Sequence, residues 1–158
     1  MPDPACVDLG ERAPEFELKN QYGARVRAAL EWQRGPLVLF FFPDAGASEY
    51  ATEARAFGEV MNVFRAEGAS LVAVSRDRVV RHAFFAVEHS LTFSLLSDPG
   101  GRVSRLYGLD QTPPARTVRV TYVIDRHGIV RHRFASDSHS YQHVSSALDV
   151  VRDLGRAR

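Results

Sequence analysis

Cysteine is almost absent from this 158-residue sequence, in which Cys6 is the only one. A single thiol cannot form a disulfide within the chain, and it excludes Cys-x-x-Cys redox motifs and cysteine-based zinc sites. Lysine is as scarce, because Lys19 is the sole example and arginine supplies the other basic charges. The formal net charge is only +1, so the sequence favours neither a nucleic-acid partner nor a membrane surface.

Long apolar stretches are missing as well. No run approaches the roughly 18 residues that a membrane span needs, and the N-terminus lacks the charged and apolar segments of a secretory signal. We therefore expect a cytoplasmic protein that does not enter a membrane. The length and the 45% hydrophobic content predict one domain over residues 1–158, with residues 1–8 flexible because proline and aspartate are frequent there.

Motifs for cofactors are also lacking. The pair Gly100 and Gly101 does not have the spacing of a phosphate-binding glycine loop, and no Gly-x-Ser-x-Gly nucleophile elbow is present. His139 and His143 are spaced to share a helix face, as metal ligands can be, but only Asp137 is close enough in sequence to be a third ligand. We therefore interpret these histidines as surface residues and expect no metal and no cofactor.

The most informative stretch runs from residue 37 to residue 64. Residues 37–42 form an unbroken apolar run of strand length, which is typical of a strand buried on both faces. Pro43 ends this strand because it has no N–H for the ladder, and Ser48 is suited to cap a helix. Apolar side chains then recur at steps of three and four residues, which predicts a helix with one buried face. These side chains are Tyr50, Ala54, Phe57, Met61 and Phe64.

The rest of the chain alternates between strand and helix patterns. The expected strands are 13–18, 24–27, 71–75, 93–96, 118–124 and 129–134, and the expected helices are 77–89, 103–107 and 140–154. In the helix over 77–89, Val80, Phe84 and Val87 are expected to face the core. This order predicts an α/β fold with a mixed central sheet, an N-terminal β-hairpin and helices on both faces.

Several stretches resemble the peroxiredoxins, the alkyl hydroperoxide reductase and thiol-specific antioxidant family, and above all its bacterioferritin-comigratory type. The likeness covers residues 9–151 and implies a thioredoxin-like fold. Its landmarks follow the family's order along the chain. They are Gly10, Ala13, Pro14, Phe16 and Leu18 in the hairpin, then Val74 to Asp77, Leu95 to Pro99, and Tyr107 with Gly108.

The family's active-site motif is proline, three residues, threonine, two residues and cysteine. On this chain Pro43 matches the proline, Ala47 stands at the threonine position, and Tyr50 stands at the position of the peroxidatic cysteine. Glu53 matches an acidic residue three positions later, and Arg119 matches the arginine that lowers the pKa of the thiol in the family. The resemblance therefore implies a vestigial active site made of these five positions.

A tyrosine at position 50 cannot perform the family's reaction. The reaction needs a thiolate that attacks the peroxide and returns from the sulfenic state. A phenol has an ordinary pKa of about 10, against about 8.5 for a thiol, and it has no such two-electron cycle. We therefore expect no thiol peroxidase activity and interpret the chain as a binding or regulatory pseudoenzyme. Tyr50 then either fills the former pocket or helps to bind a ligand.

Two kinds of partner and one alternative function stay open. A small anion, such as phosphate, sulfate or a carboxylate, is expected at the helix N-terminus beside the arginine. The candidate residues for it are Ser48, Glu49, Tyr50 and Arg119. A homodimer is equally open. The alternative function is an antioxidant, thiol-dependent peroxidase that uses Cys6, although Cys6 precedes the first hairpin and has no helix N-terminus of its own.

Overall fold

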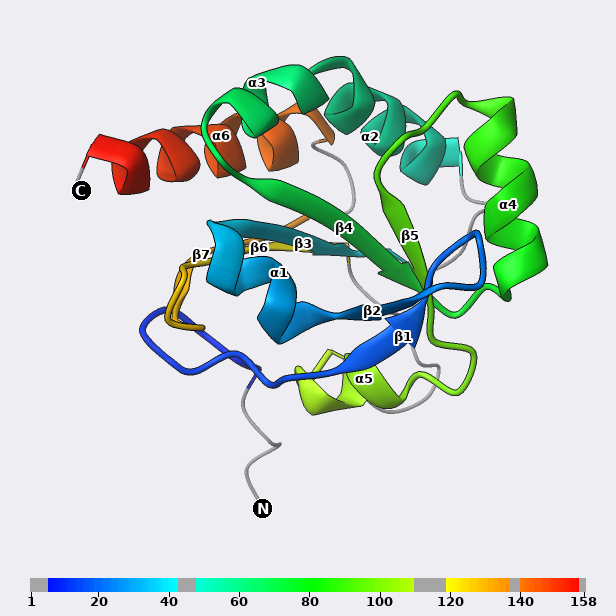
Figure 1. Cartoon of the computed structure of the whole chain (residues 1–158), viewed down its shortest axis with the longest axis horizontal. Coiled ribbons are helices and arrows are strands. Elements are labelled where there is room, and N and C mark those ends of the chain that lie inside the picture. The colour runs from blue at the N-terminus through cyan, green and yellow to red at the C-terminus, as the bar shows by residue number, and fades with distance from the viewer. Residues whose placement is uncertain (1–5, 43–47, 110–118, 137–139, 157–158) are drawn as a thin grey trace.

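The described part of the chain forms seven strands in one mixed β-sheet (Figure 1). The computed structural model describes residues 6–42, 48–109, 119–136 and 140–156, and every structural statement below concerns these residues. The strands are β1 (Glu17–Lys19), β2 (Arg25–Arg27), β3 (Leu37–Phe41), β4 (Ser70–Ser75), β5 (Ser94–Ser97), β6 (Val120–Ile124) and β7 (Val130–Ala135). They lie in the order β2-β1-β5-β4-β3-β6-β7.

Helices cover both faces of the sheet. They are α1 (Ala28–Arg34), α2 (Ser48–Glu59), α3 (Met61–Ala66), α4 (Val79–Glu88), α5 (Arg102–Leu106) and α6 (Ser140–Arg156). Helices α2, α3, α4 and α6 contribute to the apolar cluster on one face, while α1 and α5 contribute to the cluster on the other. Figure 1 shows α2, α3 and α6 together above the sheet and α5 below it. Within the residues described, none of these helices has the length and apolar character needed to cross a membrane.

Strand β3 lies at the centre of the fold and is buried along its whole length. It pairs in parallel with β4 and antiparallel with β6. Its side chains alternate between the two apolar clusters, with Val38 and Phe40 on one face and Leu39 and Phe41 on the other. Because both edges are paired and both faces are covered, every position in this strand is apolar, as the sequence predicted.

The ends of the parallel strands position the candidate site. Strands β3, β4 and β5 run in the same direction, so their carboxyl ends meet at one edge of the sheet. Helix α2 begins at this edge after β3, and α4 begins there after β4. Polar side chains that follow these strands are therefore brought close to the first turns of two helices.

The predicted fold class is confirmed, including the hairpin of β1 and β2 and the helices on both faces. The five side chains predicted for one helix face are all buried, but the helix is divided at Val60 into α2 and α3. Helix α1 is not predicted from the sequence, because its seven residues are too few for a clear apolar period.

The orientation of α4 differs from the prediction. Val80, Phe84 and Val87 are 62%, 71% and 81% exposed, whereas His82 and Phe85 are buried. Apolar residues occur on both sides of this helix, so periodicity alone does not identify the buried face. The inward side is fixed by the hydrogen bonds that His82 makes to the ends of two strands.

The N-terminal segment is anchored from residue 6 onward. The thiol of Cys6 donates a hydrogen bond to the carbonyl oxygen of Gly108 at 3.1 Å, and the backbone N–H of Val7 donates to the carbonyl of Tyr107 at 3.2 Å. Val7 is buried. In the segment predicted to be flexible, Cys6 and Val7 are therefore held beside the end of α5, and residues 1–5 lie outside the described part.

Candidate functional site

Tyr50 lies in the first turn of α2, just beyond the end of β3. Its side chain is fully buried. The ring stacks on Phe42, with centroids 3.2 Å apart and planes inclined by 9°, and on Phe85, at 4.7 Å and 13°. A stack of three aromatic rings therefore lies at the position where the sequence resemblance places the family's reactive cysteine.

The hydroxyl group of Tyr50 is buried and has no hydrogen-bond partner among the described residues. Burial raises the pKa of this phenol well above its ordinary value, and the negative charges of Asp77 and Glu53 raise it further. The phenol is therefore neutral. A buried hydroxyl without a partner lowers the stability of the folded state by about 1–3 kcal/mol.

A buried ion pair lies one turn further along α2. Glu53 is fully buried, and its Oε2 is 3.3 Å from Nη1 of Arg119, which is 3% exposed. The same guanidinium nitrogen donates to the hydroxyl oxygen of Ser140 at 3.1 Å. The charge of Arg119 is thus matched by a carboxyl group and is not directed into an open pocket.

His143 of α6 completes this cluster. Its Nε2 is 2.8 Å from the carbonyl oxygen of Ser136, so Nε2 carries a hydrogen. Its Nδ1 is 2.8 Å from Oγ1 of Thr121 and 3.2 Å from Oε1 of Glu53. If the imidazole is neutral and its hydrogen is on Nε2, Nδ1 carries a lone pair. An ionised Glu53 would place a second lone pair, on Oε1, against Nδ1, and the two would repel each other. A proton therefore lies between these two atoms, bonded either to the carboxyl group of Glu53 or to Nδ1 of His143.

The protonation of Glu53 is set mainly by its burial. Removal from water raises the pKa of Glu53 from 4.5 to about 7, although Arg119 opposes this rise through its charge and its hydrogen bond. The carboxyl group consequently titrates near neutral pH, unlike an exposed glutamate. The Glu53 cluster can therefore change its charge within the physiological range.

A second buried polar network joins the ends of β4 and β5. Ser75 donates to Oδ2 of Asp77 at 2.6 Å and accepts from Nε2 of His82 at 2.7 Å. Nδ1 of His82 lies 3.2 Å from the hydroxyl oxygen of Ser97. Burial lowers the pKa of His82, although Asp77 raises it, which agrees with a neutral ring. The hydroxyl group of Ser75 already donates its hydrogen to Asp77, so His82 cannot act as the base that activates it. Ser75, Asp77 and His82 therefore connect the strand ends and do not form a nucleophile with its base.

The sole thiol lies on the other side of the sheet. Cys6 packs against the apolar cluster that contains Leu39 and Phe41, whereas Tyr50 belongs to the opposite cluster. The buried sheet therefore separates the sulfur of Cys6 from Tyr50 and Glu53.

The structure brings together Tyr50, Glu53 and Arg119, which the resemblance to the family placed in one pocket. The other proposed positions lie outside the described residues. They are Pro43, Ala47 and the side chains of Ser48 and Glu49.

Two buried histidines were missed by the sequence interpretation. His143 was interpreted as a surface residue, but it is fully buried, as is His82. The available signal was the position of His143 directly before Val144, which shares the buried face of α6 with Ala147 and Val151. The two remaining members of the weak metal pattern, Asp137 and His139, lie outside the described residues.

Comparison with known proteins gives a match over most of the chain. The model of the AhpC/TSA family covers residues 9–133. This chain belongs to the AhpC/TSA family. Chloroplastic peroxiredoxin Q of Triticum aestivum is 30% identical over 152 residues, which are 94% of this chain and 68% of that protein. Chloroplastic peroxiredoxin Q of Sedum lineare is 30% identical over 154 residues, or 95% and 81% of the two chains.

Solved structures of AhpC/TSA proteins extend the match to the whole fold. Peroxidoxin BcpB from Mycobacterium tuberculosis is 30% identical, with a TM-score of 0.89 over 94% of this chain and 98% of that one. A second structure is that of the bacterioferritin comigratory protein of Xanthomonas campestris, for which an alkyl peroxide reduction activity is described. Its TM-score is 0.82. It is 20% identical and covers 89% of this chain and 92% of that one, so this second likeness shows the fold alone. The expected thioredoxin-like peroxiredoxin fold is confirmed.

Proposed function

We propose that this AhpC/TSA protein has no thiol peroxidase activity and serves as a binding or regulatory pseudoenzyme. One observation carries the proposal: a buried tyrosine, stacked between Phe42 and Phe85, occupies position 50. The family's reaction needs a thiolate that attacks the O–O bond and is then reduced from the sulfenic state. The neutral phenol of Tyr50 offers neither property.

The surroundings of Tyr50 support the same proposal. A reactive thiol needs positive charge nearby to hold it in the ionised form. Here Arg119 is paired with Glu53, and the charges that act on Tyr50, from Asp77 and Glu53, both raise the pKa of its hydroxyl. Burial and these two charges therefore keep the phenol at position 50 protonated, so Tyr50 offers no anionic nucleophile.

Consumption of hydrogen peroxide with dithiothreitol as the reductant tests this proposal. We expect the wild type and Cys6→Ser to match the rate of the reductant alone. The double variant Ala47→Thr/Tyr50→Cys restores the family motif beside Glu53 and Arg119, and it should gain turnover. Replacement of the large ring leaves a cavity that costs about 3–5 kcal/mol, so circular dichroism must confirm that the double variant is folded. Catalytic turnover by the wild type would contradict the proposal.

The alternative function, a peroxidase that uses Cys6, has less support. Cys6 lies across the sheet from the Arg119 pair, and its thiol donates to the carbonyl oxygen of Gly108. The same assay distinguishes the two functions, because wild-type turnover that disappears in Cys6→Ser would establish the alternative.

We also propose that a small anion binds at Arg119 by replacing Glu53. The guanidinium is held by the Glu53 carboxyl group, so an anion must compete with that group. Protonation of Glu53, whose pKa is raised to about 7 by burial, removes the negative charge of the carboxyl group and weakens its ion pair with Arg119, so an anion competes with it more easily. Affinity should therefore increase as the pH falls through 7.

Thermal unfolding with added sulfate tests the anion site, because sulfate keeps its charge between pH 6 and pH 8. We expect sulfate to raise the unfolding midpoint of the wild type more at pH 6 than at pH 8. Arg119→Ala should abolish this difference. Midpoints that rise equally in the wild type and in Arg119→Ala would remove the proposal.

We propose, finally, that the chain forms a homodimer through α4. The exposed side chains of Val80, Phe84 and Val87 form an apolar stripe along this helix, and such a stripe on a soluble protein commonly marks an interface. Arg81 and Glu88 lie beside it, near opposite ends of the helix. A two-fold axis near Phe84 packs α4 antiparallel against its copy. This places Val80 near Val87 and Arg81 near Glu88 of the second copy, so both the apolar and the charged groups are complementary.

A further inference from the structure

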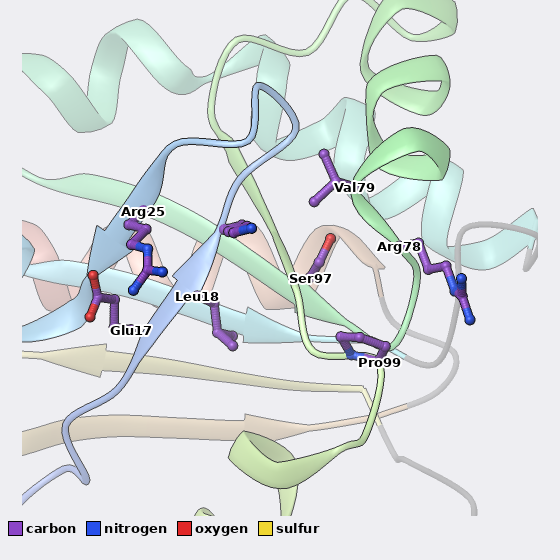
Figure 2. A pocket seen from close by; sticks show the side chains of 8 residues that line it. Glu17, Leu18, Arg25, Arg78, Val79, Ser97 and Pro99 are labelled. Carbon is purple, nitrogen blue, oxygen red and sulfur yellow. The ribbon is translucent and has the colours of Figure 1, made fainter.

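A surface pocket of about 520 Å³ lies between the N-terminal hairpin and the start of α4 (Figure 2). Its walls come from β1, β2, the end of β5 and the beginning of α4. The volume falls within the range of about 300–1,000 Å³ that is usual for small-molecule sites. None of its lining residues belongs to the Tyr50 site or to the Glu53 cluster.

Positive charge is concentrated around this pocket. Lys19, Arg25 and Arg78 line it, and Glu17 is the only acidic residue among the lining residues. Three positive charges and one negative charge leave an excess of two, while the whole chain has a formal net charge of only +1. The pocket therefore attracts anions more strongly than the surface as a whole.

Two of these cations face each other across the hairpin. Lys19 and Arg25 are directly opposite in the antiparallel register of β1 and β2. Neither side chain forms an ion pair or a hydrogen bond within the described part of the chain. Like charges in directly opposite positions of a hairpin are destabilising, so an anion bound between them would relieve an existing repulsion.

The facing wall supplies the third cation. Arg78 precedes the ten-residue helix α4, whose first turn has neither a side-chain cap nor an acidic residue. Figure 2 shows Arg25 and Glu17 on one side of the pocket and Arg78 on the other, with Ser97 and Val79 between them. The Arg78 side chain points outward in this view and is exposed, so rotation about its own bonds is sufficient to bring its guanidinium over a ligand.

The floor of the pocket is fixed in place. Ser97 lies opposite Lys19 in the pairing of β1 with β5, and its hydroxyl is held by Nδ1 of His82. Leu18, Val79 and Pro99 add apolar surface to the walls. The pocket thus combines movable cations at its mouth with a rigid, partly apolar lining.

We propose that this pocket binds a small organic dianion with an apolar group, of the class of phosphate monoesters. The facing pair Lys19 and Arg25 suits a doubly charged headgroup, and an arginine can bind a phosphate through two parallel hydrogen bonds. The apolar walls suit the ester group.

Titration calorimetry of the full chain with phenyl phosphate tests this site. We expect saturable binding of one ligand per chain. Lys19→Gln/Arg25→Gln should weaken binding by about a hundredfold, because each of the two charge-assisted contacts contributes about one order of magnitude. Arg78→Gln should weaken it as well. The matched control Arg126→Gln removes an exposed charge from the turn at the other end of the sheet and should leave the affinity unchanged.

Several results would overturn the proposal. The first is the absence of saturable binding at millimolar phenyl phosphate. The second is a loss of affinity in Arg126→Gln equal to that in Lys19→Gln/Arg25→Gln. The third is binding that survives in Lys19→Gln/Arg25→Gln and is lost in Arg119→Ala. The last result would assign the anion to the Glu53 cluster. Inorganic phosphate that binds as tightly as phenyl phosphate would overturn the role of the apolar walls. An acidic peptide that binds where phenyl phosphate does not would assign the surface to a protein partner. Circular dichroism confirms that each variant is folded before its affinity is compared.

Discussion

Replacement of Glu53 by glutamine should change how the stability of the protein depends on pH. Burial raises the pKa of Glu53 from 4.5 to about 7 in the folded state. Between these two pH values the folded chain holds a proton that the unfolded chain has released. Stability therefore falls as the pH rises through this window. In Glu53→Gln an uncharged amide replaces the carboxyl group, so this contribution disappears.

The size of the effect follows from the displacement of the pKa. A displacement from 4.5 to about 7 corresponds to a loss of about 3 kcal/mol in wild-type stability across the window, at about 1.4 kcal/mol for each pH unit. From pH 5 to pH 8, the free energy of unfolding of Glu53→Gln should therefore rise by about 2–3 kcal/mol relative to the wild type. His82 and His132, whose pKa values are lowered by burial, act in the opposite direction but are present in both proteins and cancel in the difference.

Urea unfolding at pH 5, 6, 7 and 8, followed by the fluorescence of Trp32, measures this difference. Glu59→Gln, which removes an exposed carboxyl group at the end of the same helix, is the matched control and should follow the wild-type profile. Parallel profiles for the wild type and Glu53→Gln would refute the reasoning. A relative loss of stability at high pH would show that the attraction of Arg119 outweighs burial.

Three further predictions concern packing and assembly. Tyr50→Phe removes a buried hydroxyl without a described partner and should stabilise the chain by about 1–3 kcal/mol in urea unfolding; a loss of stability would reveal a hidden partner. Phe84→Glu should turn a dimer into a monomer in analytical ultracentrifugation, whereas Tyr141→Glu, on another exposed aromatic residue, should not; a monomeric wild type would exclude the interface. Gly128 has a φ of +79°, and a Cβ atom added to it would lie 3.2 Å from the Trp32 ring. Gly128→Ala should therefore lower the stability by about 1–2 kcal/mol; an unchanged midpoint of thermal unfolding would contradict this.

The central unit of the fold could be predicted because its pattern is local. The apolar run of β3 requires burial on both faces, and the spacing from Tyr50 to Phe57 requires one buried helix face. The family resemblance placed Glu53 and Arg119 in one site, but it did not predict their ion pair, since no local pattern connects residues so far apart in sequence.

The electrostatics of the site could not be predicted in the same way. The contact of His143 with Glu53 depends on how α6 packs over α2, and a histidine beside Val144 gives no indication of its partner. The face of α4 was misjudged because Phe84 and Phe85 are equally apolar, and the choice between them follows from the buried bonds of His82. Long-range polar contacts therefore decided what hydrophobic periodicity left ambiguous.

The rate at which purified wild-type protein consumes hydrogen peroxide at neutral pH, with dithiothreitol in excess, tests the central claim most directly. With the buried, neutral Tyr50 at the proposed reactive position, the protein should give the same rate as the buffer with reductant, at any protein concentration. A rate that increases in proportion to the wild-type protein, over many turnovers, would contradict the account.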